Sequence, residues 1–197
     1  FYKSKINKIK FCKKNNWKID ENIILFLGRI NKYKGIFLLL EAFKTLIDNK
    51  YKCNLLIIGN DEINFKNFIS KIDPKYKKRI LILNHKMDIN FYYSLSSIFC
   101  LPSYREGFGM SVIEASSSFL PVVVSDIYGL NDSCIKNKTG LKFKNGSSLD
   151  LEDKLKYLIN NPKKMELFAI NGRNFVDKNF NQKDVSKFIL NFIRKIN

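Results

Sequence analysis

Short apolar runs alternate along the chain with segments whose apolar residues recur at helical spacing. The run 22–28 is apolar after its first residue and ends in glycine, and the run 53–59 also ends in glycine. Between them, the segment 34–50 carries apolar residues three and four positions apart, which is the period of one helix face. This pattern predicts a buried strand, a helix and a second buried strand.

The same alternation continues to the end of the chain. Further strands are predicted at 79–84, 97–103, 120–126 and 139–144. Further helices are predicted at 62–72, where Pro74 would end the helix, at 88–97, just after Gly109, and at 151–161, 162–180 and 182–196. Strands that are apolar throughout and are each followed by a helix indicate a parallel sheet covered on both faces. We therefore predict an α/β fold: a Rossmann-like, doubly wound parallel sheet of about six strands with helices on both faces.

Composition narrows the class of protein. With 197 residues, of which 45% are hydrophobic, the chain can bury a core and does not resemble a disordered segment. No apolar run approaches the roughly 18 residues of a membrane-spanning helix. The first residue is Phe1, so we take the chain to be part of a longer protein.

The formal charge of +17 allows a nucleic-acid partner as one interpretation. The lysines are nevertheless spread over most of the chain, which favours a solvated surface. The exception is the segment 1–18, which is dense in lysine and could lie on an anionic membrane surface.

The cysteines indicate a reducing compartment. Cys12, Cys53, Cys100 and Cys134 are far apart and share no C-x-x-C spacing. We expect buried thiols and a cytoplasmic location. Because no cluster of histidine and cysteine is present, we predict no metal site.

Candidate chemistry lies where predicted strands end, because ligands of doubly wound sheets bind at the carboxyl ends of the strands. Arg29 and Lys34 follow the first strand, and a guanidinium with an ammonium suits a diphosphate. The spacing is not that of a P-loop. Taken alone, two cations in a lysine-rich protein could equally be solvated surface.

The stretch 102–115, PSYREGFGMSVIEA, is more specific. Gly107, Phe108 and Gly109 form a tight turn before a helix, whose free amides can bind an anion or a hydroxyl oxygen. Glu106 lies on the turn, and Glu114 lies about two helical turns further on. Carboxylates accept hydrogen bonds from vicinal hydroxyls, which a sugar nucleotide carries at both ends. The alternative is that Glu106 interacts with the helix dipole and Glu114 is a surface residue.

The stretch 106–114 resembles the E-x7-E signature of retaining glycosyltransferases of family 4 (group 1), which have the GT-B fold. The segments 25–35 and 82–109 are similar to the parts of that family that flank the signature, and 120–126 and 139–143 fall where its next strands lie. The match is collinear over about residues 22–145, and it implies the carboxyl-terminal, donor-binding half of a GT-B fold.

The resemblance implies a role for each loop. Arg29 and Lys34, after Gly28, would bind the donor diphosphate, and Glu106 would bind the transferred sugar. These three are the candidate catalytic residues, because the main catalytic task expected here is to stabilise charge on the leaving diphosphate.

The resemblance also assigns the rest of the donor. Gly107 and the amides of Phe108 and Gly109 would face the sugar and the phosphate, and Glu114 would bind the ribose. His85 and Lys86 would border the base, and His85 is not expected to be a catalytic base. Neither a metal nor another cofactor is expected.

Two segments depart from the family pattern. Where the family commonly has a small-Gly-x-Pro turn, this chain has residues 118–121, SFLP. Where the family commonly has a Gly-Gly-x-x-Glu segment, this chain has residues 128–132, YGLND, and Asp132 lies near the position of the usual glutamate. Both place the loop after the fifth strand in doubt as a diphosphate contact.

The amino-terminal acceptor domain of the family is also missing. Residues 1–20 would be a linker or helix leading from it, 21–180 the nucleotide-sugar domain, and 181–197 a helix packing toward it.

The expected function is hexosyl transfer with retention, from a UDP-, GDP- or CDP-linked donor to a lipid-linked or other glycan acceptor. The expected process is bacterial surface polysaccharide biosynthesis by a cytoplasmic enzyme that could be peripheral to the membrane. This part alone is expected to be inactive. A GT-B-fold sugar-nucleotide epimerase and a basic nucleic-acid-binding module are the alternatives.

Overall fold

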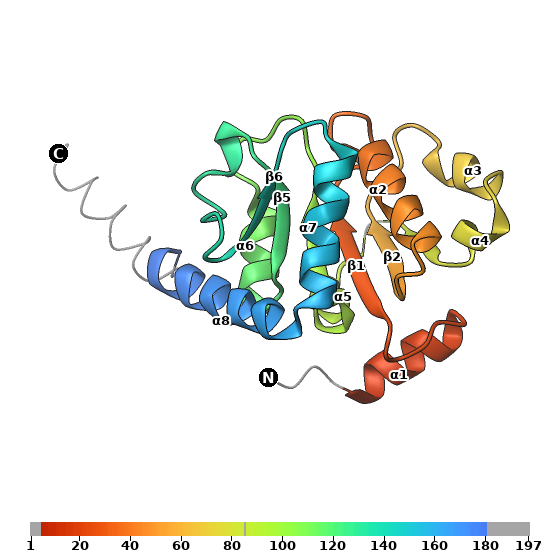
Figure 1. Cartoon of the computed structure of the whole chain (residues 1–197), viewed down its shortest axis with the longest axis horizontal. Coiled ribbons are helices and arrows are strands. Elements are labelled where there is room, and N and C mark those ends of the chain that lie inside the picture. Colours follow the sequence, from red (N-terminus) through yellow and green to blue (C-terminus); the bar gives the residue numbers. More distant parts are fainter. Residues whose placement is uncertain (1–4, 85, 181–197) are drawn as a thin grey trace, which may run out of the picture.

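The computed structural model describes residues 5–84 and 86–180. Its centre is one six-stranded sheet in the order β3-β2-β1-β4-β5-β6, and every pairing is parallel (Figure 1). The strands are β1 (Asn22–Leu27), β2 (Cys53–Ile58), β3 (Ile80–Leu83), β4 (Ile98–Leu101), β5 (Val122–Ser125) and β6 (Gly140–Phe143). The predicted α/β, Rossmann-like fold is confirmed, and each strand lies inside its predicted range.

Helices cover both faces of the sheet. They are α1 (Lys5–Lys14), α2 (Ile36–Asp48), α3 (Phe65–Ser70), α4 (Pro74–Lys77), α5 (Ile89–Leu95), α6 (Met110–Ser117), α7 (Ser148–Asn160) and α8 (Pro162–Asn179), with a short 3₁₀ helix, η1 (Tyr128–Leu130). Helices α2 and α7 pack side by side on one face, and α8 packs against α6 on the other (Figure 1). The helix predicted at 182–196 lies outside the described residues.

The strand order determines where a ligand can bind. Strand β1 is flanked by β2 on one side and by β4 on the other, so the order along the sheet reverses between β1 and β4. The loops after these two strands therefore start next to each other at the carboxyl edge. In doubly wound sheets this switch point is where ligands bind.

One predicted helix differs in the structure. The segment 62–72 contains only α3, and α4 forms a separate turn. The carboxylate of Asp61 accepts hydrogen bonds from the amides of Ile63, Phe65 and Lys66, which hold the chain in a turn until Phe65. The Asp73 carboxylate then caps α4. Local side-chain capping therefore overrides the helical spacing here.

The lysine-rich start is packed onto the domain. Phe11 of α1 contacts the rings of Phe91 and Tyr92 edge to face, and Trp17 donates to the Lys78 carbonyl at 3.2 Å.

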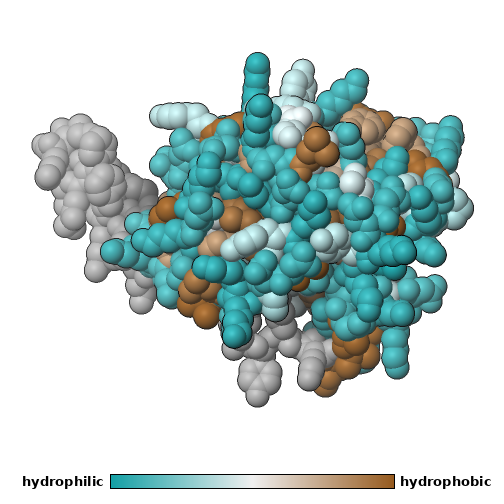
Figure 2. Space-filling model, viewed as in Figure 1, coloured by the Kyte–Doolittle hydropathy of each residue, from teal (hydrophilic) through white to brown (hydrophobic). Residues whose placement is uncertain are grey.

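The visible face of the molecule is largely hydrophilic, with hydrophobic residues in separate patches (Figure 2). Among the described residues, no helix is both long and apolar enough to cross a bilayer.

The four cysteines are free and buried, as the sequence predicts. Cys53 lies in β2 and Cys100 in β4. Burial raises the pKa of the Cys53 thiol to about 12 and that of Cys134 to about 11. Such thiols stay protonated and unreactive at neutral pH.

Glu21 should make the stability of the domain depend on pH. Its buried carboxylate accepts from Asn54 Nδ2 at 2.8 Å and from Arg79 Nη1 at 3.1 Å. Burial opposes ionisation, but these hydrogen bonds prevail and lower the pKa of Glu21. Because the folded pKa lies below the unfolded value of about 4.3, this stabilisation is present above that pH and is lost as the pH falls.

We expect Glu21→Gln to lower the free energy of unfolding by about 1–3 kcal/mol at pH 7. The difference from the native chain should shrink steadily below about pH 4. Urea titrations at pH 7 and pH 3.5 measure it, with Glu41→Gln on the exposed face of α2 as the control. A Glu21→Gln deficit that is the same at both pH values would show that the ionised carboxylate is not the source.

Candidate functional site

The loop after β1 is fixed between the loops after β2 and β4. On one side, the amide of Ile30 donates to the Asn60 carbonyl at 2.8 Å. On the other, the amide of Tyr104 donates to the Tyr33 carbonyl at 2.8 Å. The two stretches that carry the predicted ligand-binding residues, 28–35 and 102–109, are therefore joined by their backbones.

Gly35 brings these loops into direct contact. It has φ +70° and precedes the first residue of α2. A Cβ at this position would lie 1.9 Å from the carbonyl oxygen of Pro102, which no side chain can tolerate. The close approach places Lys34, the preceding residue, against the turn that carries Glu106.

Lys34 and Glu106 form an ion pair. Lys34 Nζ lies 2.5 Å from Glu106 Oε1, and the Ser103 hydroxyl donates to the same oxygen at 2.7 Å. The two side chains are only 20% and 10% exposed. Among the described residues, no hydrogen bond reaches the other oxygen, Oε2. Glu106 is thus held through one oxygen and can accept from a ligand through the second.

Arg29 lies at the rim of the same loop. Its side chain is 68% exposed, and Nη1 lies 3.5 Å from Glu62 Oε1, which is a weak contact. Glu62 is itself held by Asn31, whose Nδ2 donates to Oε2 at 2.7 Å. The guanidinium can therefore turn toward an anion at little cost.

The turn 107–109 leads into α6. Gly109 is the N-cap in the left-handed conformation, and the first amides of the helix have no acceptor within it. A Cβ at Gly107 would meet nothing within 4 Å, so the backbone is open there. The ring of Phe108 packs against Phe180, with ring centroids 5.5 Å apart. This leaves the backbone of the turn, rather than the ring of Phe108, as the surface available to a ligand.

Glu114 is held by α5. The Tyr93 hydroxyl donates to Glu114 Oε2 at 2.9 Å. Burial, and then the negative charge of Glu114, raise the pKa of Tyr93, so the phenol keeps its proton and remains a donor. No hydrogen bond from the described residues reaches Glu114 Oε1. Like Glu106, this carboxylate is oriented through one oxygen and has the other free.

The structure gives less support to the two residues predicted to border the nucleotide base. His85 lies outside the described residues. Lys86 is exposed and lines a hollow of about 530 Å³ together with Lys10 and Lys14 of α1 and the ring of Phe91. Lys86 therefore faces α1, and its contact with a base stays a prediction. Gly28 directly follows β1 and is half-buried at the start of the site loop.

The loop after β5, doubted from the sequence, lies directly behind the Glu106 turn. A Cβ at Gly129 would lie 1.8 Å from the Glu106 carbonyl oxygen. Phe119, where the resembling family has a glycine, adopts the left-handed conformation with φ +57°. Phe119 lies before β5, and its left-handed φ is one that glycine adopts without strain. Asp132 is exposed.

Comparison with known proteins identifies the family. Residues 7–175 match the family model described as "Glycosyl transferases group 1". The chain belongs to the group 1 glycosyl transferases.

The chain is similar both to curated relatives and to solved structures. The capsular polysaccharide biosynthesis glycosyltransferase CapM of Staphylococcus aureus is 29% identical over 184 residues, which cover 91% of this chain and 48% of CapM. The Anabaena protein Alr3699/HepE, solved in complex with UDP-glucose, superposes with a TM-score of 0.82 at 16% identity, covering 96% of this chain and 53% of HepE. The chain thus spans about half the length of these relatives.

A third match is to a structure that holds a single domain. The C-terminal domain of the group 1 glycosyl transferase LpcC from Francisella tularensis superposes with a TM-score of 0.74 at 23% identity. The match covers 87% of this chain and 91% of that domain. The chain therefore has the fold of that domain over most of its length.

The side chains that orient Glu106 and Glu114 were not predicted from the sequence. Ser103 and Tyr93 both donate to them, and Asn31 holds Glu62. A signal existed for Ser103, which precedes Glu106 by three residues on one tight turn. None existed for Tyr93, because its pairing with Glu114 depends on how α5 packs beside α6.

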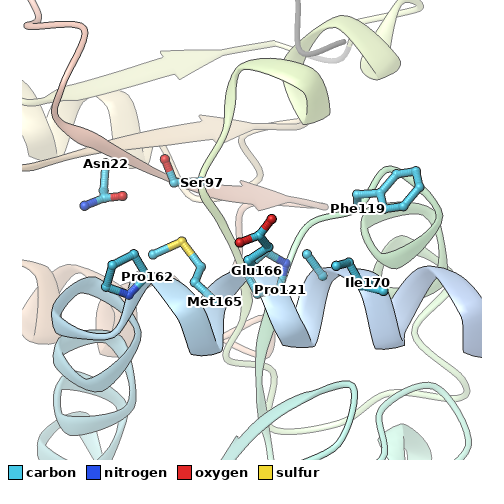
Figure 3. Close-up of a pocket in the computed structure, with 9 residues that line it drawn as sticks. Asn22, Ser97, Phe119, Pro121, Pro162, Met165, Glu166 and Ile170 are labelled. Carbon is cyan, nitrogen blue, oxygen red and sulfur yellow. The ribbon is translucent and has the colours of Figure 1, made fainter. Parts of the chain in front are cut away.

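A hollow of about 350 Å³ lies away from the candidate site (Figure 3). Its wall includes Asn22 at the start of β1, Ser97 just before β4, Pro121 just before β5, and Met165 of α8. These residues mark the amino-terminal edge of the sheet, opposite the loops described above. The hollow is therefore not part of the candidate site.

Proposed function

We propose that this chain is the donor-binding domain of a retaining hexosyltransferase that binds a nucleotide-linked sugar at the carboxyl edge of β1 and β4. The observation that carries the proposal is the pair of half-satisfied carboxylates. Glu106 and Glu114 are each anchored through one oxygen, and no described residue occupies the other. Two fixed acceptors on either side of a helix start suit a ligand with a hydroxyl pair at each end.

The assignment of ligand parts follows from the arrangement. Glu114 lies inside α6 beside α5 and is assigned the ribose hydroxyls. Glu106 lies on the turn beside Lys34 and is assigned the transferred sugar. The diphosphate between them would meet Lys34, Arg29 and the first amides of α6, an arrangement suited to an anion.

The ion pair between Lys34 and Glu106 gives this assignment a mechanism. In the free protein the ammonium is neutralised by the carboxylate. When a donor binds, the diphosphate would draw Lys34 away, and sugar hydroxyls would replace it on Glu106. The ammonium would then stabilise negative charge as the diphosphate leaves, which assists transfer with retention without a metal or a base from this domain.

The relatives support a role in surface polysaccharide synthesis. CapM is named for capsular polysaccharide biosynthesis, and HepE was solved with UDP-glucose. Since the chain spans about half of each, we propose that the remainder of the protein binds a glycan acceptor and that transfer requires both parts.

A thermal-shift screen of the purified chain tests the proposal. We expect one of UDP-, GDP- or CDP-hexose, at about 100 times its dissociation constant, to stabilise the domain by about 2.7 kcal/mol. For a chain of this size that raises Tm by roughly 5–10 °C. The shift should fall sharply in Lys34→Met and persist in Lys163→Met, an exposed lysine at the start of α8.

The screen also tests the nucleic-acid alternative. A single-stranded oligonucleotide should give no comparable shift. A shift with the oligonucleotide and none with any nucleotide sugar would overturn the proposal in favour of a basic nucleic-acid-binding module.

A further inference from the structure

Lys142 is a buried ammonium that the proposed chemistry does not use. It lies on β6, where its neighbours in the strand are Gly140, Leu141 and Phe143, and its side chain is 5% exposed. Burying an ammonium costs several kcal/mol unless polar partners compensate it. An apolar side chain of similar size would remove that cost. A buried ammonium at this position is therefore expected to hold the groups that it contacts.

Its two partners are the ends of one short segment. Lys142 Nζ donates to Asn131 Oδ1 at 2.6 Å and lies 3.9 Å from Asp126 Oδ1. Asp126 directly follows β5, and Asn131 directly follows η1. One ammonium thus joins the beginning and the end of residues 126–131, which we call the β5 segment.

The β5 segment supports the turn that carries Glu106. The backbone of Gly129 lies so close to the Glu106 carbonyl oxygen that a Cβ would be 1.8 Å away. The side chain of Leu130 lies against Gly109, the N-cap of α6. A shift of the β5 segment would therefore move both Glu106 and the first amides of α6.

Of the two side chains that Lys142 contacts, only that of Asn131 depends on it. Asp126 has a second cation, Lys136 Nζ, at 3.1 Å, and its amide donates to the Phe143 carbonyl at 2.7 Å. For the Asn131 side chain, by contrast, the Lys142 ammonium is the hydrogen-bond donor that the described structure shows. Removing the ammonium should release the Asn131 end, which is the end nearer to Gly129 and Leu130.

We propose that Lys142 is a positioning residue for the transferred sugar. By holding Asn131, it fixes the β5 segment against the Glu106 turn and so sets the geometry with which Glu106 meets the sugar hydroxyls. This inference rests on the proposed function, because it assigns the sugar to Glu106. Glu114 and its partner Tyr93 make no contact with the β5 segment in the described hydrogen bonds, so binding of the nucleoside part should not depend on Lys142.

The test compares two ligands by titration calorimetry. The probes are a nucleoside diphosphate and the matching nucleotide sugar, UDP and UDP-glucose or the pair that the thermal-shift screen selects. For Lys142→Met, we expect the nucleotide sugar to bind about tenfold more weakly and the nucleoside diphosphate to stay within about twofold of the native chain. Asn131→Ala, which changes an exposed residue and leaves β6 intact, should show the same selective loss.

Two further variants sharpen the result. Asn131→Asp keeps the acceptor oxygen and should restore native selectivity, and Lys136→Met removes the exposed partner of Asp126 and should change neither ligand. The double variant Lys142→Met, Asn131→Ala should lose no more than either single variant, because both remove the same contact.

Two results would overturn the inference. Equal losses for both ligands in Asn131→Ala would show a role in stability alone, and unchanged selectivity in both single variants would show that the β5 segment does not need the contact. A failure of the proposed function is distinguishable from these, because the native chain would then bind no nucleotide sugar more tightly than the nucleoside diphosphate or would bind neither.

Discussion

Gly35→Ala should destabilise the domain by about 3 kcal/mol or more, the largest effect that we expect from a single substitution. The native φ of +70° costs an alanine about 1–2 kcal/mol. The added Cβ would also lie 1.9 Å from the Pro102 carbonyl oxygen, so the backbone of one loop must move. That movement separates the loop of Lys34 from the turn of Glu106. Urea unfolding measures the loss, and donor titration measures its effect on the site.

Gly107→Ala is the control. Gly107 lies on the Glu106 turn, and it has neither the left-handed φ nor the crowded Cβ position of Gly35. A Cβ there meets nothing within 4 Å. We expect its free energy of unfolding to stay within about 0.5 kcal/mol of the native chain. Gly35→Ala and Gly107→Ala variants of equal stability would refute the close contact between the two loops.

Glu106→Gln should weaken the complete donor about tenfold or more, because charged acceptors contribute about 1.5–3 kcal/mol per hydrogen bond. The amide keeps the size of the side chain but has one acceptor oxygen, which the Ser103 hydroxyl already occupies, and its NH₂ group cannot accept a hydrogen bond from the sugar. A bare nucleoside diphosphate should not be weakened, since Lys34 loses its carboxylate partner and is freed to meet the phosphates. Glu41→Gln, on an exposed part of α2, is the control and should bind both ligands as the native chain does.

The sheet could be predicted from sequence because its signal is local. Each strand lies within a mostly apolar run, and β2, β4 and β5 are buried at every position. The helix predicted at 62–72 was wrong in extent. The Asp61 side chain accepts hydrogen bonds from three backbone amides and so competes with the helix. The helical spacing of Phe65 and Ile69 does not reveal this competition.

The site could be predicted only as a set of residues. The glycine turn and the two glutamates are adjacent in sequence, but Lys34 meets Glu106 across 72 positions and Tyr93 meets Glu114 across 21. The first contact depends on the strand order, in which β1 lies beside β4, and the second depends on how α5 packs beside α6. Lys142 was missed for a related reason, since a lysine in a short strand of a lysine-rich chain gives no sign that its ammonium is buried.

The most direct measurement of the central claim is a set of four dissociation constants, for Glu106→Gln and Glu114→Gln with the nucleoside diphosphate and with the complete nucleotide sugar. We expect Glu114→Gln to weaken both ligands by similar factors, because both contain the ribose. Glu106→Gln should weaken only the ligand that carries the sugar. A Glu106→Gln variant that loses the bare diphosphate as severely as the donor would contradict the assignment of the two carboxylates.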